Sequence, residues 1–532
     1  MKNILKYSSG ALVTAALLVS CHKDLDRFPP NDVTSEVVYS TEAGYKQVLA
    51  KVYGSMALTG NEGPAGSGDV AGIDEGTSDF LRLFWKAQEL STDEAVVSWN
   101  DVGIHDFHNM NWSANNPMLN GLYNRCFYII TLCNEFIRES DPARITTRGL
   151  GTSAASIAKM RAEARFIRAY QYWVLMDLFA NPGYVDETTA LGAGSLPDQI
   201  KRADLFVKLE TDLKAMETEL ADPKTNEYGR ADKAAAWALL ARMYLNAEVY
   251  TGTAKWSEAI TYSKKVIDAG YTLLPEYKHL LLADNNVGNT EVILSVNYDG
   301  VKTRNYGGTT FIVNASVNGD NAQQKDSAGL TGWSGIRATK NLPMLFPGYP
   351  SFGTITDKRA QFYTNGQNPE INDITKFTDG YAVIKYRNKT KAGQLGSDPG
   401  RTFSDIDFPL FRLGEMYLIY AEAVTRGGTG GSTAQAVTYF NLLRQRAYGN
   451  TSGNVTTLTT DLILDERARE LYWEAFRRSD LIRYNKFVES TYLWPWKGGV
   501  ASGTGVPAFR KIYPIPATEV GANPKIKQNP NY

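Results

Sequence analysis

Apolar residues spaced three and four positions apart recur along most of the chain, and this spacing constrains the fold more than any other feature. Such spacing places the apolar side chains on one face of an α-helix. It occurs in the segments 45–56, 166–174, 206–220, 231–249 and 255–269, and again in 413–424, 434–447 and about 461–476. Because the chain has 532 residues, which is too many for one small core, we expect two or more packed regions or one large helical array. The sequence therefore predicts a mainly α-helical protein.

Two of these segments have small residues where neighbouring helices would touch. Residues 234–245 read Ala-Ala-Ala-Trp-Ala-Leu-Leu-Ala-Arg-Met-Tyr-Leu, and Trp256, Ala259 and Gly270 follow. Alanines let two helices approach closely, and a glycine at 270 suits a helix C-cap. The pattern resembles a tetratricopeptide helix pair, in which stacked pairs bury a continuous core. We predict a tetratricopeptide-like helical array, with ordinary helix packing as the alternative.

Residues 276–405 interrupt the helical pattern. The run 291–297 (Glu-Val-Ile-Leu-Ser-Val-Asn) predicts a strand, and a region rich in Gly, Asn and Thr follows it. Long loops on a rigid scaffold commonly carry function. We therefore expect an inserted region of loops and short strands that forms the ligand face of the helical frame.

These changes of pattern divide the chain into regions. We expect a signal peptide at 1–20, a tether at 21–40, an N-terminal helical region at 41–275 and a C-terminal region at 276–532. The C-terminal region divides further into the loop-rich ligand face at 276–405, helices at 406–490 and a closing segment at 491–532.

The N-terminus has the features of a lipoprotein export signal. Lys2 and Lys6 precede an apolar run at 11–20, which is shorter than the roughly 20 residues needed to span a bilayer. The run ends in Leu-Val-Ser-Cys21, which looks like a bacterial lipobox, in which the cysteine carries the lipid. We predict that Cys21 is lipidated and that two or more acyl chains anchor the protein stably. The alternative is an ordinary signal peptide followed by a chance cysteine.

The two remaining cysteines, Cys126 and Cys133, lie on one helical stripe. Seven residues of helix separate them by roughly 10 Å, which is too far for a disulfide bond. We expect both to be small buried apolar side chains.

The sequence offers little that points to catalysis, a metal or a cofactor. With 56 Lys and Arg against 57 Asp and Glu, the chain lacks the basic footprint that nucleic-acid binding requires. His105 and His108 have no third ligand nearby, and the glycine-rich segment 60–72 lacks the Lys-Ser/Thr ending of a phosphate loop. The adjacent acids Asp93 and Glu94 are one pair among many. We predict no catalytic residue, no metal site, no cofactor and no nucleic-acid partner.

Several aromatic residues instead lie in polar loops. Trp99, Trp112, Tyr298 and Trp333 are flanked by Gly, Ser, Asn and Asp, which give them little apolar company. Taken singly, an aromatic residue in such a loop is more often a partly buried anchor of the loop than a ligand-binding ring. Together they suit carbohydrate, because a sugar ring stacks its C–H face on an aromatic ring while its hydroxyls bond to amide and charged side chains.

Six ordered motifs carry a resemblance to the SusD/RagB family, the lipid-anchored glycan-binding proteins of Gram-negative outer membranes. They lie, after the lipobox, at 91–94, 163–170, 228–234, 411–423, 466–483 and 515–532. The Arg and Glu residues of 466–483 are tempting as a site, but we expect them to form buried or half-buried ion pairs inside the helical frame.

The resemblance implies a role and a location. Members capture oligosaccharide at the cell surface without catalysis, commonly sit as a lid on a TonB-dependent SusC-like transporter and pass glycan into it. This implies that Cys21 holds the protein in outer-membrane lipid, facing the cell exterior. Within the family the chain is most similar to starch-binding members, which hold a curved α-glucan on an arc of three aromatics. The implied cargo is therefore starch or malto-oligosaccharide.

The same resemblance implies site residues. The arc would be formed by Trp99, Tyr298 and Trp333. Polar side chains that would assist them are Arg82, Asp74, Asn100, Asp101, Lys302 and Arg304.

Three alternatives remain open at the level of sequence. The same family role could serve another cargo, such as a different glycan, a glycoprotein or a peptide, and buried arc aromatics would favour it. A surface glycosidase would release reducing sugar from starch. A pure scaffold would bind only protein.

Overall fold

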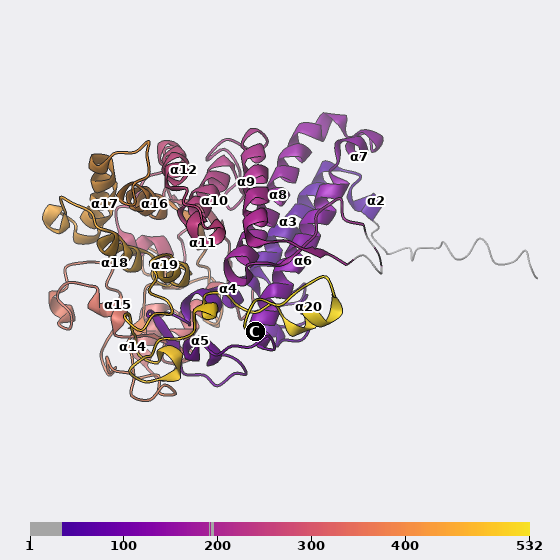
Figure 1. Ribbon diagram of the computed structural model, residues 1–532. Coiled ribbons are helices and arrows are strands. Elements are labelled where there is room, and N and C mark those ends of the chain that lie inside the picture. Colours follow the sequence, from indigo (N-terminus) through magenta and orange to yellow (C-terminus); the bar gives the residue numbers. More distant parts are fainter. Residues whose placement is uncertain (1–34, 191, 193–195) are drawn as a thin grey trace, which may run out of the picture.

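The computed structural model describes residues 35–190, 192 and 196–532, and its secondary structure is mainly helical, as predicted (Figure 1). The predicted signal peptide, Cys21 and most of the tether lie outside the described residues. Side chains from both predicted halves of the body join one hydrophobic cluster that extends from Tyr39 to Ile526. Within the part of the chain that the structure describes, none of the helices is long and apolar enough to cross a membrane.

The N-terminal helices lie mostly on one side of the molecule, except for the two at 80–89 and 106–109, which lie against C-terminal segments (Figure 1). They are α2 (Ser35–Val38), α3 (Glu42–Ala57), α4 (Phe80–Glu89), α5 (Asp106–Asn109), α6 (Pro117–Glu139), α7 (Pro142–Thr147), α8 (Ala154–Phe179) and α9 (Arg202–Ala215). The long helices α6 and α8 lie against each other, and α3 packs on both. The Asn116 side chain caps α6 by accepting hydrogen bonds from two backbone amides, and Pro117 suits the first turn. Cys126 and Cys133 are buried on α6 and free, as predicted.

The next helices stack one on another and include the pair that the sequence predicts at 231–249 and 255–269. They are α10 (Lys233–Leu245), α11 (Ala247–Thr251), α12 (Trp256–Asp268), α16 (Leu413–Thr425) and α17 (Thr433–Tyr448). Helix α10 packs on α12, α12 on α16, and α16 on α17. Gly270 follows α12 with a φ of +83°, which confirms the expected glycine after the helix. The predicted helix 231–249 is divided into α10 and α11. Helix α10 ends at Leu245, and the side chain of the capping residue Asn246 donates to the Arg242 carbonyl.

The helix expected at 461–476 also ends early. Helix α18 (Thr460–Leu471) stops before Trp473 and Ala475, which both have a φ of +65°, and α19 (Arg477–Arg483) follows. The backbone amide of Trp473 donates to the Glu94 carboxylate, and that of Ala475 donates to Glu89. These contacts replace the helical hydrogen bonds, so that tertiary packing overrides the periodic pattern.

Residues 276–405 lie beside helices α16 to α19 and contain short helices and strands (Figure 1). The remaining helices are α13 (Gly308–Ala315), α14 (Ala322–Ala328), α15 (Asn341–Met344) and, near the C-terminus, α20 (Ala517–Ala522). Strand β4 (Val292–Val296) confirms the strand expected at 291–297 and pairs antiparallel with β8 (Phe408–Arg412). The other antiparallel pairs are β1 (Ala95–Val97) with β5 (Ile336–Ala338), β2 (Gly183–Tyr184) with β3 (Asp198–Gln199), and β6 (Phe362–Tyr363) with β7 (Ala382–Val383).

Buried ion pairs connect these layers. Glu470 pairs with Arg412 at 2.6 Å, with Arg359 at 3.1 Å and also with Arg446. Arg477 pairs with Asp93 at 2.7 Å. This confirms that the charged motif at 466–483 belongs to the internal frame.

Candidate functional site

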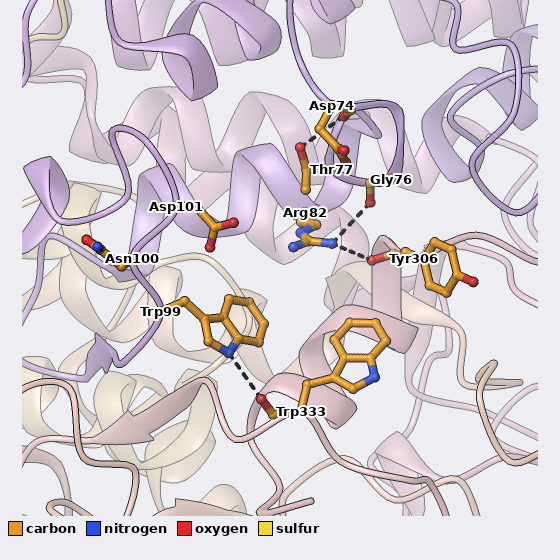
Figure 2. Close-up of a pocket in the computed structure, with 9 residues that line it drawn as sticks. All are labelled: Asp74, Gly76, Thr77, Arg82, Trp99, Asn100, Asp101, Tyr306 and Trp333. Atoms are coloured by element: carbon orange, nitrogen blue, oxygen red, sulfur yellow. Dashed lines mark hydrogen bonds between the residues drawn. The ribbon is translucent and has the colours of Figure 1, made fainter.

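A cleft of about 630 Å³ opens where the N-terminal helices meet the loop-rich region (Figure 2). Its walls combine aromatic rings, carboxylates, an amide and a guanidinium group. The residues lining it are Asp74, Gly76, Thr77, Arg82, Trp99, Asn100, Asp101, Tyr306 and Trp333.

The pairing of β1 with β5 brings two tryptophans together. Beyond the ends of these strands, the Ser98 amide donates to the Gly335 carbonyl at 2.8 Å, and the Trp99 indole nitrogen donates to the Trp333 carbonyl at 3.1 Å. The ring centroids of Trp99 and Trp333 lie 6.5 Å apart with an interplanar angle of 43°. A Cβ at Gly335 would lie 2.4 Å from the Trp99 ring, so this approach requires glycine.

Tyr306 adds a third ring. Its centroid lies 6.2 Å from that of Trp333, and the two planes are inclined by 59°. The three rings therefore follow one another at successive tilts and do not lie in one plane.

Arg82 lies between the segment 74–77 and the rings of Trp99 and Trp333 (Figure 2). It is in the first turn of α4, which the Asp79 side chain caps. Its Nη1 donates to the Gly76 carbonyl at 3.1 Å and to the Tyr306 carbonyl at 2.8 Å. The guanidinium carbon lies 5.9 Å from the Trp99 ring centroid. Burial lowers the pKa of Arg82 to about 10, so it remains charged at neutral pH.

The structure brings six of the nine predicted ligand-binding residues to this cleft. They are Trp99, Trp333, Arg82, Asp74, Asn100 and Asp101. Sequence reasoning missed Gly76, Thr77 and Tyr306. The one available signal for Tyr306 was its position in the same polar loop as Lys302 and Arg304.

The expected placement of three residues needs correction. Tyr298 is only 6% exposed and does not line the cleft, because it directly follows β4 and its amide donates to the buried Asp407 carboxylate at 2.8 Å. Lys302 and Arg304 are exposed but also lie outside the cleft lining. The Arg304 guanidinium lies over the Phe403 ring at 5.7 Å. Tyr306 takes the place in the arc expected for Tyr298.

Other motifs of the sequence have structural roles. Trp112 is buried, and its indole nitrogen donates to the Tyr532 hydroxyl at 2.7 Å, which makes it a loop anchor. Asp93 is buried against Arg477, whose charge holds the carboxyl pKa below its usual range despite the opposing effect of burial. Among the described residues no cluster of His, Cys, Asp and Glu has a metal-binding arrangement.

The cleft can therefore stack flat apolar faces and bond hydroxyl groups. Its rings offer apolar surface, Arg82 offers donors, and Asp74 and Asp101 offer acceptors. A mainly helical frame with such a cleft is suited to a protein that binds polyhydroxylated ligands.

Comparisons with known proteins place the chain in a family. Residues 344–532 match the model described as the SusD family, and residues 68–245 match the model "Starch-binding associating with outer membrane". The starch-binding protein SusD of Bacteroides thetaiotaomicron is 34% identical over 100% of this chain and 99% of its own length. A SusD-like protein of Bacteroides ovatus is 22% identical over 93% and 85%. The chain belongs to the SusD family.

Solved structures agree on the fold. A SusD-like carbohydrate-binding protein from Bacteroides fragilis superposes with a TM-score of 0.73 at 18% identity, covering 92% of this chain and 100% of that one. Surface glycan-binding protein A from Bacteroides thetaiotaomicron, solved with laminarihexaose, gives a TM-score of 0.69 at 20% identity with the same coverage.

Proposed function

We propose that this protein binds starch or malto-oligosaccharides on the arc formed by Trp99, Trp333 and Tyr306. The observation that carries the proposal is the successive tilt of the three rings, 43° and then 59°. A curled α-glucan presents its sugar faces around a bend, so a curved set of rings can contact several of them. A flat row of rings would suit a straight chain such as cellulose.

The polar lining supports a neutral glycan. Arg82 holds donors at the floor of the cleft, while Asp74, Asn100 and Asp101 offer acceptors and an amide. Vicinal hydroxyls of a pyranose both donate and accept, and this set satisfies both. The sequence similarity to a protein named for starch binding points the same way.

The cellular role follows from family membership and from the N-terminal sequence. In this proposal Cys21 carries the lipid, the body faces the cell exterior from the outer membrane, and bound glycan passes to a TonB-dependent SusC-like transporter. The description of the matching family model, which names association with the outer membrane, supports the location. The protein acts by binding and not by hydrolysis, in keeping with the names of its relatives.

Affinity electrophoresis tests the cargo. The soluble body, residues 22–532, is run through native gels cast with amylopectin, dextran, xylan, inulin or laminarin. We expect retardation by amylopectin alone. Retardation by laminarin or xylan instead would transfer the role to another glycan, and reducing-sugar release from starch by the pure protein would contradict a purely binding role.

A further inference from the structure

Tyr228 is the most exposed aromatic residue in the described part of the chain. Its side chain is 46% exposed, whereas the other described aromatic residues are buried or half-buried. It lies in the loop before α10, outside the cleft lining, so the arc of Trp99, Trp333 and Tyr306 does not account for it.

The Tyr228 ring is fixed although it is exposed. Its hydroxyl donates to the Asp407 carboxylate at 2.9 Å and accepts a hydrogen bond from the Ser295 hydroxyl at 3.3 Å. Asp407 is buried and also accepts the Tyr298 amide. Because the polar tip is anchored inside, the solvent-facing surface of Tyr228 is its ring. A ring held in place loses little conformational entropy when a ligand stacks on it.

Hollows lie around this ring. One of about 220 Å³ is lined by Tyr228 with Asn226, Asn289 and Thr290, among others. A second, of about 240 Å³, is also lined by Tyr228, together with polar residues that include Lys46, Glu227 and Arg230. Aromatic surface and hydrogen-bonding side chains thus occur together, as they do in the cleft.

The loop that carries Tyr228 is held in place by its contacts. Gly229 has a φ of +80°, which favours glycine, and it packs closely on the Asn297 side chain. The neighbouring Arg230 forms two hydrogen bonds with the Glu163 carboxylate, at 3.0 and 2.6 Å. The ring, its anchor and its loop are therefore preformed.

A third hollow begins beside Gly229, the neighbour of Tyr228, and reaches Thr303 in the segment that leads to Tyr306. It measures about 160 Å³, and the residues that line it include Gly54, Gly229, Asn297 and Thr303. Three residues after Thr303, Tyr306 lines the cleft. The exposed Lys302 and Arg304 lie in this connecting segment. The segment 297–306 therefore borders both the third hollow and the cleft.

We propose that Tyr228 is a second sugar-stacking site, which holds a pyranose of the same neutral polysaccharide where it extends beyond the cleft along segment 297–306. The proposal rests on the proposed function of the cleft. The second contact strengthens binding only for chains long enough to reach it, because linked weak contacts multiply in avidity.

The test compares a short with a long ligand. Maltotriose and amylopectin are titrated against the wild-type protein, Tyr228→Ala, Trp99→Ala and the control Tyr363→Ala. Tyr363 is a half-buried tyrosine whose hydroxyl bonds to Gln323 and which lines neither the cleft nor the hollows beside Tyr228. We expect Tyr228→Ala to weaken amylopectin binding by about tenfold and to leave maltotriose binding unchanged. Tyr363→Ala should alter neither.

A second variant covers the case in which loss of the Tyr228 hydroxyl unfolds the loop. Gly54 lies on α3 and lines the third hollow, and an added Cβ there meets nothing within 4 Å, so Gly54→Leu adds apolar bulk at this hollow with no clash at its Cβ. It should also weaken amylopectin binding alone. If Trp99→Ala loses both ligands, normal amylopectin binding by a folded Tyr228→Ala overturns the proposal. If Tyr228→Ala does not fold, normal amylopectin binding by Gly54→Leu overturns it instead. If Trp99→Ala binds both normally, the proposed function of the cleft fails instead.

Discussion

The indole nitrogen of Trp99 donates a hydrogen bond to the backbone carbonyl of Trp333, 3.1 Å away and 234 positions later in the chain. This bond uses the polar edge of Trp99 and leaves its ring face toward the cleft. Each of the two segments thus helps to set the orientation of the other, and the arc is built before any ligand arrives. Preformed orientation is what gives an aromatic contact most of its value in binding.

Removal of either tryptophan ring should abolish most of the affinity. We expect Trp99→Ala and Trp333→Ala each to cost about 2 kcal/mol in malto-oligosaccharide binding, as central aromatic contacts commonly do. This corresponds to a loss of about 30-fold in Kd, measured by isothermal titration calorimetry.

The matched control is Trp237→Ala on α10. This half-buried indole donates to Glu217 and lies outside the cleft lining, so affinity should remain that of the wild type. Trp99→Phe should bind at an intermediate level, because it keeps a ring but loses the hydrogen bond to the Trp333 carbonyl. Unchanged affinity in both alanine variants of the arc would show that the ligand binds elsewhere.

Variants of two tyrosines test which one supplies the third ring of the arc, Tyr306 as the structure indicates or Tyr298 as the sequence predicted. Tyr306→Ala should weaken malto-oligosaccharide binding at least about fivefold, because it removes the third ring of the arc. Tyr298→Phe should bind normally and be at least as stable as the wild type, since the Tyr298 hydroxyl is buried without a hydrogen-bond partner among the described residues. Titration calorimetry and thermal melting of both variants would decide, and normal binding by a folded Tyr306→Ala would contradict the place of Tyr306 in the arc.

The misplacement of Tyr298 shows where sequence reasoning reaches its limit. The helices α10 and α12 could be predicted because their apolar spacing repeats over many residues. The place of an aromatic residue after β4 depends on how the loop folds back, and no periodicity encodes that. Tyr298 turns inward because its amide bonds to Asp407, whereas Tyr306 reaches the cleft because Arg82 binds its carbonyl. Trp99 and Trp333 were singled out because each lies in a polar loop, and they were assigned to the arc through the family resemblance. The pairing of β1 with β5 brings them together.

Removal of one charge from the buried ion pairs around Glu470 should be strongly destabilising. We expect Glu470→Gln to lower the free energy of unfolding by about 3–5 kcal/mol, because it leaves Arg412 and Arg446 without the charge that compensates their burial. Urea denaturation measures this change. The control Glu258→Gln removes a partly exposed pair with Lys255 and should change stability by less than about 0.5 kcal/mol. Equal effects of the two substitutions would contradict a special role for the buried cluster.

The same cluster predicts acid sensitivity. The arginines around Glu466 lower its pKa to about 2, and those around Glu470 lower its pKa well below the usual range, both against the effect of burial. A carboxyl whose folded-state pKa is depressed contributes stability above the unfolded pKa, near 4.5, and loses it as the pH falls toward the folded value. Unfolding free energy should therefore decline between pH 4.5 and 2, and Glu470→Gln should show a shallower decline.

Glu89 and Glu94 should produce the opposite dependence on pH. Both carboxyls are buried, and they accept the backbone amides of Ala475 and Trp473. Burial raises the pKa of each, and repulsion from Glu94 raises that of Glu89 further. The folded state therefore binds protons more tightly than the unfolded chain, so stability falls as the pH rises above about 4.5.

Glu94→Gln isolates this contribution. The amide keeps an oxygen that can accept the Trp473 amide but cannot ionise, so the variant avoids the cost of a buried second charge. We expect it to match the wild type near pH 4 and to exceed it in unfolding free energy at pH 8, as measured by urea denaturation at each pH. Glu258→Gln, with its partly exposed carboxyl, should show no such pH-dependent gain. A constant difference between Glu94→Gln and the wild type across this range would mean that Glu94 already carries the same protonation in the folded and unfolded states.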